Sequence, residues 1–234
     1  MKQLSRENNF YYLCVSLITI LFSSAIIGQF PGTWGEDIFS LVIVFMLILS
    51  IKSLRADSVW RKSVWTLVSL LIILWVLNRT LIAPVLNDYL SLLLLFFFFA
   101  GSLKIAWKQV LFVGKVDLNR IVGSISLYLL LGLMWTIIYL SILALDPSAL
   151  TGIEAGNWRE AFPRAAYYSF ITLTTLGYGD ILPKSYLAQF FAYLEAIAGV
   201  FYMAIVVASL VSVGISEINR EVQKTKKSNC EEDT

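Results

Sequence analysis

The stretch ITLTTLGYGD, residues 171–180, places Gly177 and Gly179 on either side of Tyr178. Glycine adopts left-handed backbone dihedrals that other residues avoid. Alternating such glycines with Leu176 and Tyr178 lets successive carbonyl groups point one way while the side chains point the other. Several such strands around an axis would form stacked rings of carbonyl oxygens, which can replace the water shell of a desolvated cation. The stretch therefore predicts a cation-binding pathway.

The rest of the sequence has the composition of a membrane protein. Of its 234 residues 58% are apolar and 15% are charged, and the mean hydropathy is +0.76, whereas soluble domains carry about a quarter charged residues. A stretch at 161–173 is too short to cross a bilayer and predicts a re-entrant helix leading into the glycine-rich stretch. Longer apolar stretches predict six transmembrane helices, at 10–28, 38–51, 64–77, 89–103, 121–145 and 186–215.

The basic residues predict the orientation of these helices. With the N-terminus in the cytoplasm, all 18 Lys and Arg residues except Arg79, Arg159, Arg164 and Lys184 lie on the cytoplasmic side, as the positive-inside rule requires. We therefore expect a multi-pass protein of the plasma membrane with both termini in the cytoplasm. The first apolar stretch is longer than the apolar region of a signal peptide, which has 7–15 residues, and it therefore predicts a retained helix.

Four segments follow from this layout. A four-helix transmembrane block (1–106) precedes a connector (107–120), a pore domain (121–215) and a short cytoplasmic tail (216–234). The connector mixes apolar and basic residues, so it either lies along the inner membrane surface or forms a plain loop. The expected fold is all-α.

Composition also excludes several classes of function. The chain has no His, which removes the commonest general base and metal ligand, and its spans contain no paired carboxylates, so no enzymatic activity and no cofactor are expected. A net charge of +2 gives no reason to expect a nucleic-acid partner. The tail is too short for a soluble ligand-binding domain, and Cys14 and Cys230 are expected to be free thiols.

The glycine-rich stretch resembles the selectivity filter of the potassium channel family, with Leu176 where Val is commonest. The resemblance implies that the Thr175 hydroxyl and the carbonyls of Thr175, Leu176, Gly177 and Tyr178 bind K⁺, with Gly179 completing the filter. It also implies a homotetramer, in which three identical subunits join this chain around a central pore surrounded by membrane lipid.

The resemblance also assigns supporting residues. Asp180 matches the aspartate that anchors the outer end of the filter. Thr174 directly precedes the filter at its inner end and is expected to support it. Tyr167 and Tyr168 stand where many members have two tryptophans, and are expected to brace the filter by hydrogen bonds to Tyr178 or Asp180. Ile171 departs from some bacterial members, which have a Glu paired with the filter aspartate there.

The last apolar stretch matches the pore-lining helix of the family. Gly199 is either its hinge or a site of close helix packing. One face of this helix is expected to line the cavity and inner gate, and the alternative is that it packs against 121–145. This face consists of Val200, Met203, Ala204, Val207, Ala208 and Val211.

Glu195 is a carboxylic acid within this apolar helix, one turn from Gly199. Acids inside membranes are candidates for function. The resemblance places it behind the filter near Thr172 or Thr174, where we expect it to hold its proton, to donate a hydrogen bond to the re-entrant helix and to couple the filter to pH. A purely structural hydrogen bond is the alternative.

These observations predict a potassium-selective channel subunit. The alternatives are a weakly selective cation channel and a non-conducting subunit that modifies a partner channel. A secondary transporter would require paired broken helices, and only one re-entrant stretch is predicted.

The first four spans resemble a voltage sensor in position, but their fourth helix lacks its charges. Residues 92–99 are all Leu or Phe, and the basic residue nearest them is Lys104. A charge crossing 100 mV contributes about 2.3 kcal/mol, and steep gating needs three or four per subunit. We therefore predict no steep voltage dependence between about −100 and +100 mV in planar bilayers. A steep sigmoid that is independent of the permeant ion would refute this prediction.

Overall fold

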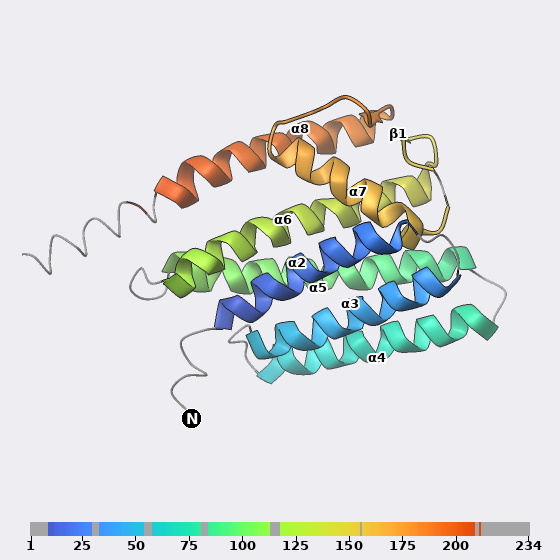
Figure 1. Ribbon diagram of the computed structural model, residues 1–234, viewed down its shortest axis with the longest axis horizontal. Helices are drawn as coiled ribbons and strands as arrows, with labels where there is room; N and C mark the ends of the chain where they lie inside the picture. The colour runs from blue at the N-terminus through green and yellow to red at the C-terminus, as the bar shows by residue number, and fades with distance from the viewer. Residues whose placement is uncertain are drawn as a thin grey trace, which may run out of the picture.

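The computed structural model describes residues 9–29, 33–53, 58–80, 84–112, 118–154, 156–208 and 211. The described chain is almost entirely helical, and Figure 1 shows long helices lying side by side. In chain order they are α2 (Asn9–Ile27), α3 (Thr33–Ser53), α4 (Ser58–Thr80), α5 (Pro84–Phe112), α6 (Leu118–Leu145), α7 (Trp158–Leu173), α8 (Tyr186–Phe201) and the π-helix η1 (Tyr202–Val207).

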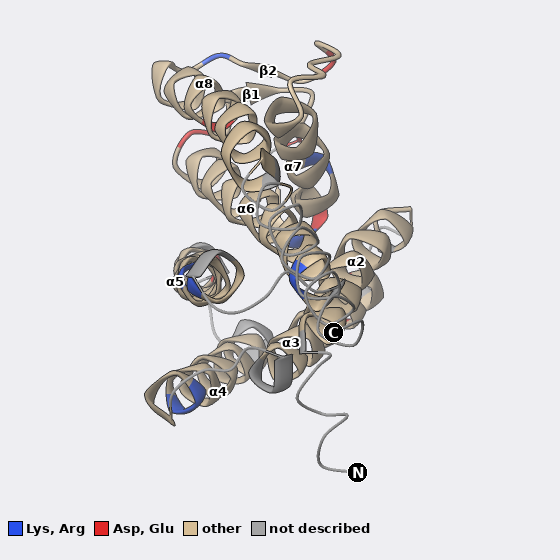
Figure 2. Cartoon of the chain, turned by 90° about the vertical axis from the view of Figure 1, so that its left-hand side faces the viewer, with Lys and Arg blue, Asp and Glu red and all other residues tan. Residues whose placement is uncertain are grey.

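Among the described residues, four helical stretches are long and apolar enough to cross a membrane. They lie in α4, α5, α6 and in α8 with η1, and α2 supplies a shorter apolar helix. A helix occurs at each of the six predicted positions, although residues 209–210 and 212–215 of the last one lie outside the described residues. Spans at α2 and α3 stay predictions. Figure 2 shows how few stretches of the helices carry Lys, Arg, Asp or Glu.

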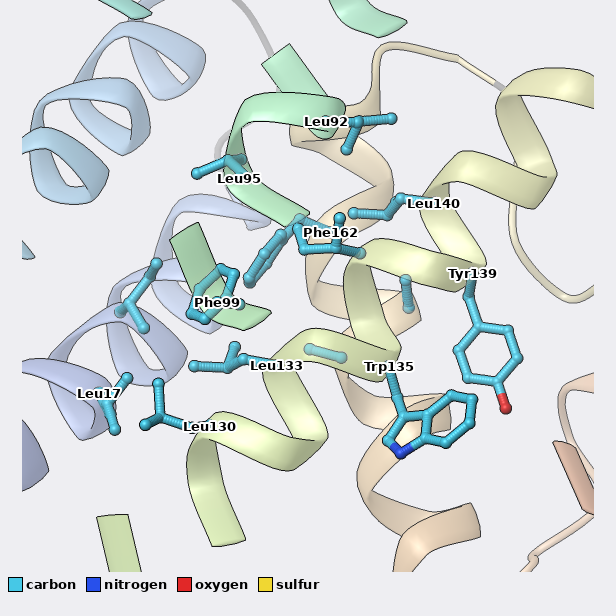
Figure 3. Packing of buried hydrophobic residues seen from close by; sticks show 14 of the residues in the cluster. Leu17, Leu92, Leu95, Phe99, Leu130, Leu133, Trp135, Tyr139, Leu140 and Phe162 are labelled. Atoms are coloured by element: carbon cyan, nitrogen blue, oxygen red, sulfur yellow. The ribbon is translucent and has the colours of Figure 1, made fainter. Parts of the chain in front are cut away.

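Helix α6 is the centre of the packing. It contacts α2, α5 and α7, and Figure 3 shows side chains of these helices converging on it, with Leu17 from α2, Phe99 from α5 and Phe162 from α7 near Leu133. All four side chains are buried. The N-terminal helices are therefore packed directly against the predicted pore domain.

Helix α4 lies at the edge of the molecule. It contacts α3 and α5, and among its described side chains only Val64 and Val68 are buried. The N-terminal helices thus provide a broad apolar surface, as expected of helices that face lipid.

The predicted connector, residues 107–120, is helical at both of its ends, and its place at the membrane surface or in a loop stays a prediction. Residues 107–112 continue α5 and 118–120 begin α6, while 113–117 lie outside the described residues. The helix continues because Val110 is buried against Gly123 of α6, and the Arg120 side chain donates a hydrogen bond to the Val110 carbonyl.

The all-α prediction missed a two-stranded ribbon. Strand β1 (Leu150–Thr151) pairs antiparallel with β2 (Leu182–Pro183), joining the loop before α7 to the loop after the glycine-rich stretch. Strands of two residues are too short for an alternating pattern to be visible in a sequence.

Gly101 tests the packing of α5 on α4. A Cβ atom there would lie 2.1 Å from the ring of Trp60, so Gly101→Ala should lower the free energy of unfolding by about 1–3 kcal/mol even though Ala favours helices. Thermal unfolding in detergent, followed by circular dichroism, measures the effect.

Gly156→Ala is the matched control, because its Cβ would make only an ordinary contact at 3.7 Å. Adding Trp60→Leu to Gly101→Ala should restore stability. Equal melting temperatures for Gly101→Ala and the wild type would contradict the packing.

Candidate ion pathway

The helix predicted to be re-entrant is α7, and its ends are defined by hydrogen bonds. Asn157 caps its N-terminus by accepting a bond from the backbone N–H of Arg159 at 3.1 Å, and the N–H of Thr174 bonds to the Phe170 carbonyl at its C-terminus. The 16 residues of α7 are too few to cross a bilayer. Its carbonyl end, which carries partial negative charge, leads into the glycine-rich stretch.

The backbone after α7 alternates in handedness. Thr175, Gly177 and Gly179 have φ of 59°, 52° and 81°, and the intervening Leu176 and Tyr178 are not in the left-handed region. A left-handed threonine is strained and persists only where its surroundings enforce it. Here the N–H groups of Leu176 and Gly177 both donate to the Ile171 carbonyl, at 2.8 and 3.1 Å.

The outer end of this stretch is held by the loops on either side. The N–H of Lys184 donates to the Ala149 carbonyl at 2.8 Å beside the β1–β2 ribbon. Gly152, with φ of 81°, approaches so closely that a Cβ would lie 2.7 Å from the carbonyl oxygen of Asp180. Tyr167 lies beside the Asp180 side chain, and its predicted hydrogen bond to Tyr178 or Asp180 stays a prediction.

Tyr168 departs from its predicted role. It is buried, and its ring packs edge-on against Tyr139 with 4.8 Å between centroids. Adjacent residues on a helix point about 100° apart. The pair therefore divides, with Tyr167 directed at Asp180 and Tyr168 at α6.

Glu195 lies at the meeting point of three helices. Its Oε2 accepts a hydrogen bond from the Tyr139 hydroxyl of α6 at 2.6 Å, and its Oε1 lies 2.6 Å from the Ser169 hydroxyl of α7. Ser169 also donates to the Gly132 carbonyl at 2.8 Å. Glu195 is fully buried, with 0% of its surface exposed. The prediction of a contact with α7 identified the right helix, but the partner is Ser169 and not Thr172 or Thr174.

A proton count describes this network. The chain of oxygens from Gly132 through Ser169 to Glu195 contains two hydrogen-bond contacts, and each contact needs one proton. The Ser169 hydroxyl supplies one and the Tyr139 hydroxyl is already donating to the other carboxyl oxygen. Both contacts are therefore complete only when Glu195 is protonated and donates to Ser169.

Sequence reasoning missed Tyr139 and Ser169. Their one signal is that each is a polar residue within an apolar stretch, but separations of 56 and 26 residues from Glu195 give no pattern from which a contact could be predicted.

The inner helix packs closely against α7 at Gly199. A Cβ there would lie 1.9 Å from the Leu173 carbonyl oxygen, so the close-packing alternative explains this glycine. The helical geometry changes from α to π three residues after Gly199, in η1. There the Tyr202 hydroxyl donates to the Ser124 carbonyl of α6. Bulges of this kind often occur at functional sites.

The predicted lining residues lie on the exposed side of the inner helix. Tyr202 and Val206 are buried, and the following are exposed in the single chain: Val200, Met203, Ala204, Ala208 and Val211. The side chain of Val207 lies outside the described residues.

Comparisons with known proteins point to the same region. Residues 126–215 match the model of a family described as ion channel. This part of the chain is therefore similar to an ion channel domain. This domain begins within α6 and includes α7, the glycine-rich stretch and the inner helix, whereas α2–α5 lie outside the match.

Curated relatives match a short part of the chain. The A-type voltage-gated potassium channel KCND3 of Rattus norvegicus, Oryctolagus cuniculus and Homo sapiens is 34% identical over 67 residues, which is 29% of this chain and 10% of each relative. The chain thus covers about a tenth of the length of these relatives. No solved structure matches it.

Glu195→Gln tests the proton count. A glutamine amide donates to Ser169 and accepts from Tyr139 as a protonated carboxyl does, so assembly and K⁺ flux should be retained. Glu195→Ala would leave the buried Tyr139 hydroxyl without its acceptor, at a cost of about 1–3 kcal/mol, whereas Ser169 keeps its bond to the Gly132 carbonyl.

The network also predicts that flux depends on pH. When Glu195 loses its proton, the Ser169 hydroxyl supplies the single proton for two contacts, so flux through the wild type should change at alkaline pH, and Glu195→Gln should not respond. A glutamine variant with the pH dependence of the wild type leaves Glu195 a structural role alone.

Proposed function

We propose that this chain is one subunit of a homotetrameric, potassium-selective channel of the plasma membrane. It conducts K⁺ passively, has no enzymatic activity and no cofactor, and is not steeply gated by voltage. The observation that carries the proposal is the alternating backbone of residues 175–179, which directly follows the re-entrant helix α7 and precedes an inner helix within the matched ion channel domain.

The requirements of a desolvated cation support four subunits. One strand supplies one carbonyl oxygen at each level, whereas replacing the water shell of K⁺ takes a ring of them from four chains. Residues 174–180 are exposed in the single chain, so they are accessible to the same residues of other copies. Helix α8 also exposes large apolar side chains that copies of the chain or lipid would cover, among them Leu187, Phe190, Tyr193, Leu194 and Ile197.

The proposed path of the ion runs from the outer surface inward. K⁺ binds the carbonyls of Tyr178, Gly177, Leu176 and Thr175 in turn, and then the Thr175 hydroxyl. It leaves into a cavity lined by the exposed face of the inner helix. The carbonyl end of α7 points toward this region, and its partial negative charge lowers the energy of a cation there.

The relatives support selectivity for K⁺ but not the mode of gating. They are named as voltage-gated potassium channels over a match of 67 residues, whereas α2–α5 lie outside the ion channel match. The eight residues of α5 that would carry sensor charges are Leu and Phe. The proposed channel therefore has the pore of these relatives without their response to voltage.

The filter prediction tests this function. Purified wild-type protein in liposomes should pass K⁺ and exclude Na⁺. Gly177→Ala should abolish or degrade this selectivity because a methyl group is strained at φ of 52°, and Thr175→Cys should do so because it removes the hydroxyl ring.

Size-exclusion chromatography should show that both variants still form the wild-type oligomer. Unaltered K⁺-over-Na⁺ preference in either variant would contradict the filter assignment. Equal K⁺ and Na⁺ flux through the wild type would indicate a weakly selective cation channel. If an intact tetramer passes neither ion, the chain is a non-conducting subunit.

A further inference from the structure

Arg159, in the first turn of α7, is buried although it is charged. Only 7% of its surface is exposed. Burial lowers the pKa of its guanidinium, against the opposing effect of Asp88 and Glu36, which indicates a site with little water. Burying a charge is costly unless good partners surround it. Arg159 has no part in the proposed ion path, so its burial requires another explanation.

The partners of Arg159 belong to the N-terminal helices. Its Nη1 lies 3.3 Å from Oδ1 of Asp88 in α5, and its Nε donates to the Ser40 hydroxyl of α3 at 3.1 Å. The guanidinium also stacks over the Trp158 ring, 4.6 Å from its centroid. A planar guanidinium with several donors fixes both position and direction.

Asn157, the cap of α7, makes a second link of the same kind. Its Nδ2 donates to the Glu36 carboxylate in the first turn of α3, while its Oδ1 lies 3.4 Å from Nη1 of Arg159. Two polar residues at the start of α7 are thus bonded to the outer ends of α3 and α5.

The surroundings make these polar contacts important for the position of α7. A cavity of about 180 Å³ beside Arg159 is lined by α3, α4 and α5 and by Trp158. Packing is therefore incomplete where the N-terminal helices meet the start of α7. The opposite end of α7 carries the Ile171 carbonyl that holds Leu176 and Gly177, and one continuous helix joins the two ends.

We propose that Arg159 is a positioning residue through which α3 and α5 set the conformation of the filter. The inference rests on the proposed function. A shift of the outer ends of α3 or α5 moves the start of α7 through Asp88, Ser40 and Glu36, and the C-terminal end of α7 transmits the movement to residues 175–179. The N-terminal helices thereby act on the pore at its outer side.

A double-mutant cycle on open probability tests the link. In planar bilayers with K⁺, Asp88→Asn and Arg159→Gln should each change the ratio of open to closed channels by about fivefold. The double variant should change it no further than either single variant, which gives a coupling of about fivefold. Arg159→Lys, which keeps the charge but not the fork, should recover only part of the wild-type value.

Arg164→Gln is the matched control, because Arg164 is an exposed arginine of the same helix. Its effect should multiply with that of Asp88→Asn. If the pair of residues 88 and 164 shows the same coupling as the pair 88 and 159, or if residues 88 and 159 act independently, the proposal is wrong.

Hydrogen exchange gives a readout that does not depend on conduction. In the assembled protein, Asp88→Asn and Arg159→Gln should at least double the exchange rate of the amides in residues 171–180, and Arg164→Gln should not. Unchanged filter exchange in Asp88→Asn, in protein that elutes as the wild-type oligomer, overturns the proposal. If the wild type conducts no K⁺, the proposed function fails and the exchange data still test the link. If Arg159→Gln does not fold, Asp88→Asn and Ser40→Ala provide the same comparison.

Discussion

Two hydrogen bonds to a single carbonyl group, that of Ile171, end helix α7 and turn the chain into the glycine-rich stretch. They fix a left-handed conformation at Thr175 that an isolated chain would avoid. Backbone at membrane depth must be satisfied by protein or line a cavity. The proposed filter is therefore only as well defined as the position of Ile171, and hence of α7.

The rest of the fold holds α7 from three directions. On the side that faces α6 and α8, Glu195 joins Ser169 of α7 to Tyr139 of α6. Because Gly199 has no side chain, α8 can approach the Leu173 carbonyl closely. At the far end of the stretch, the β1–β2 ribbon and the close approach of Gly152 to Asp180 hold the chain. At its N-terminus, Arg159 and Asn157 connect it to α3 and α5. Polar contacts in a dry environment are directional, which suits a helix whose end must be placed accurately.

The parts that the sequence predicted depend on local chemistry. The left-handed conformation of Gly177 and Gly179 follows from the positions of the glycines, and the helices follow from runs of apolar residues. The same conformation at Thr175 was not predicted, because it depends on the bonds to the Ile171 carbonyl. The α7 helix was expected at 161–173 and begins three residues earlier, at Trp158, because Asn157 caps it. The continuation of α5 past residue 106 was missed because its cause is the packing of Val110 on a distant helix.

The contacts that were not predicted join residues far apart in the chain. Whether Tyr167 or Tyr168 reaches Asp180 depends on how α7 is rotated against α6, and the partner of Glu195 depends on the same rotation. The π-helix η1 likewise has no marker in its own residues, Tyr202–Val207, because the Tyr202 bond to Ser124 belongs to the packing. A single sequence specifies which residues can make such contacts but not which pairs form.

Imaging the assembled protein by cryo-electron microscopy, in high and in low K⁺, tests the central claim most directly. We predict four chains around one axis, with the carbonyl groups of Thr175, Leu176, Gly177 and Tyr178 facing that axis. In high K⁺, ion density should lie between successive carbonyl rings, and in low K⁺ this density should weaken. An assembly in which these carbonyls face away from a shared axis, or a filter region whose density is the same in both conditions, would contradict the account.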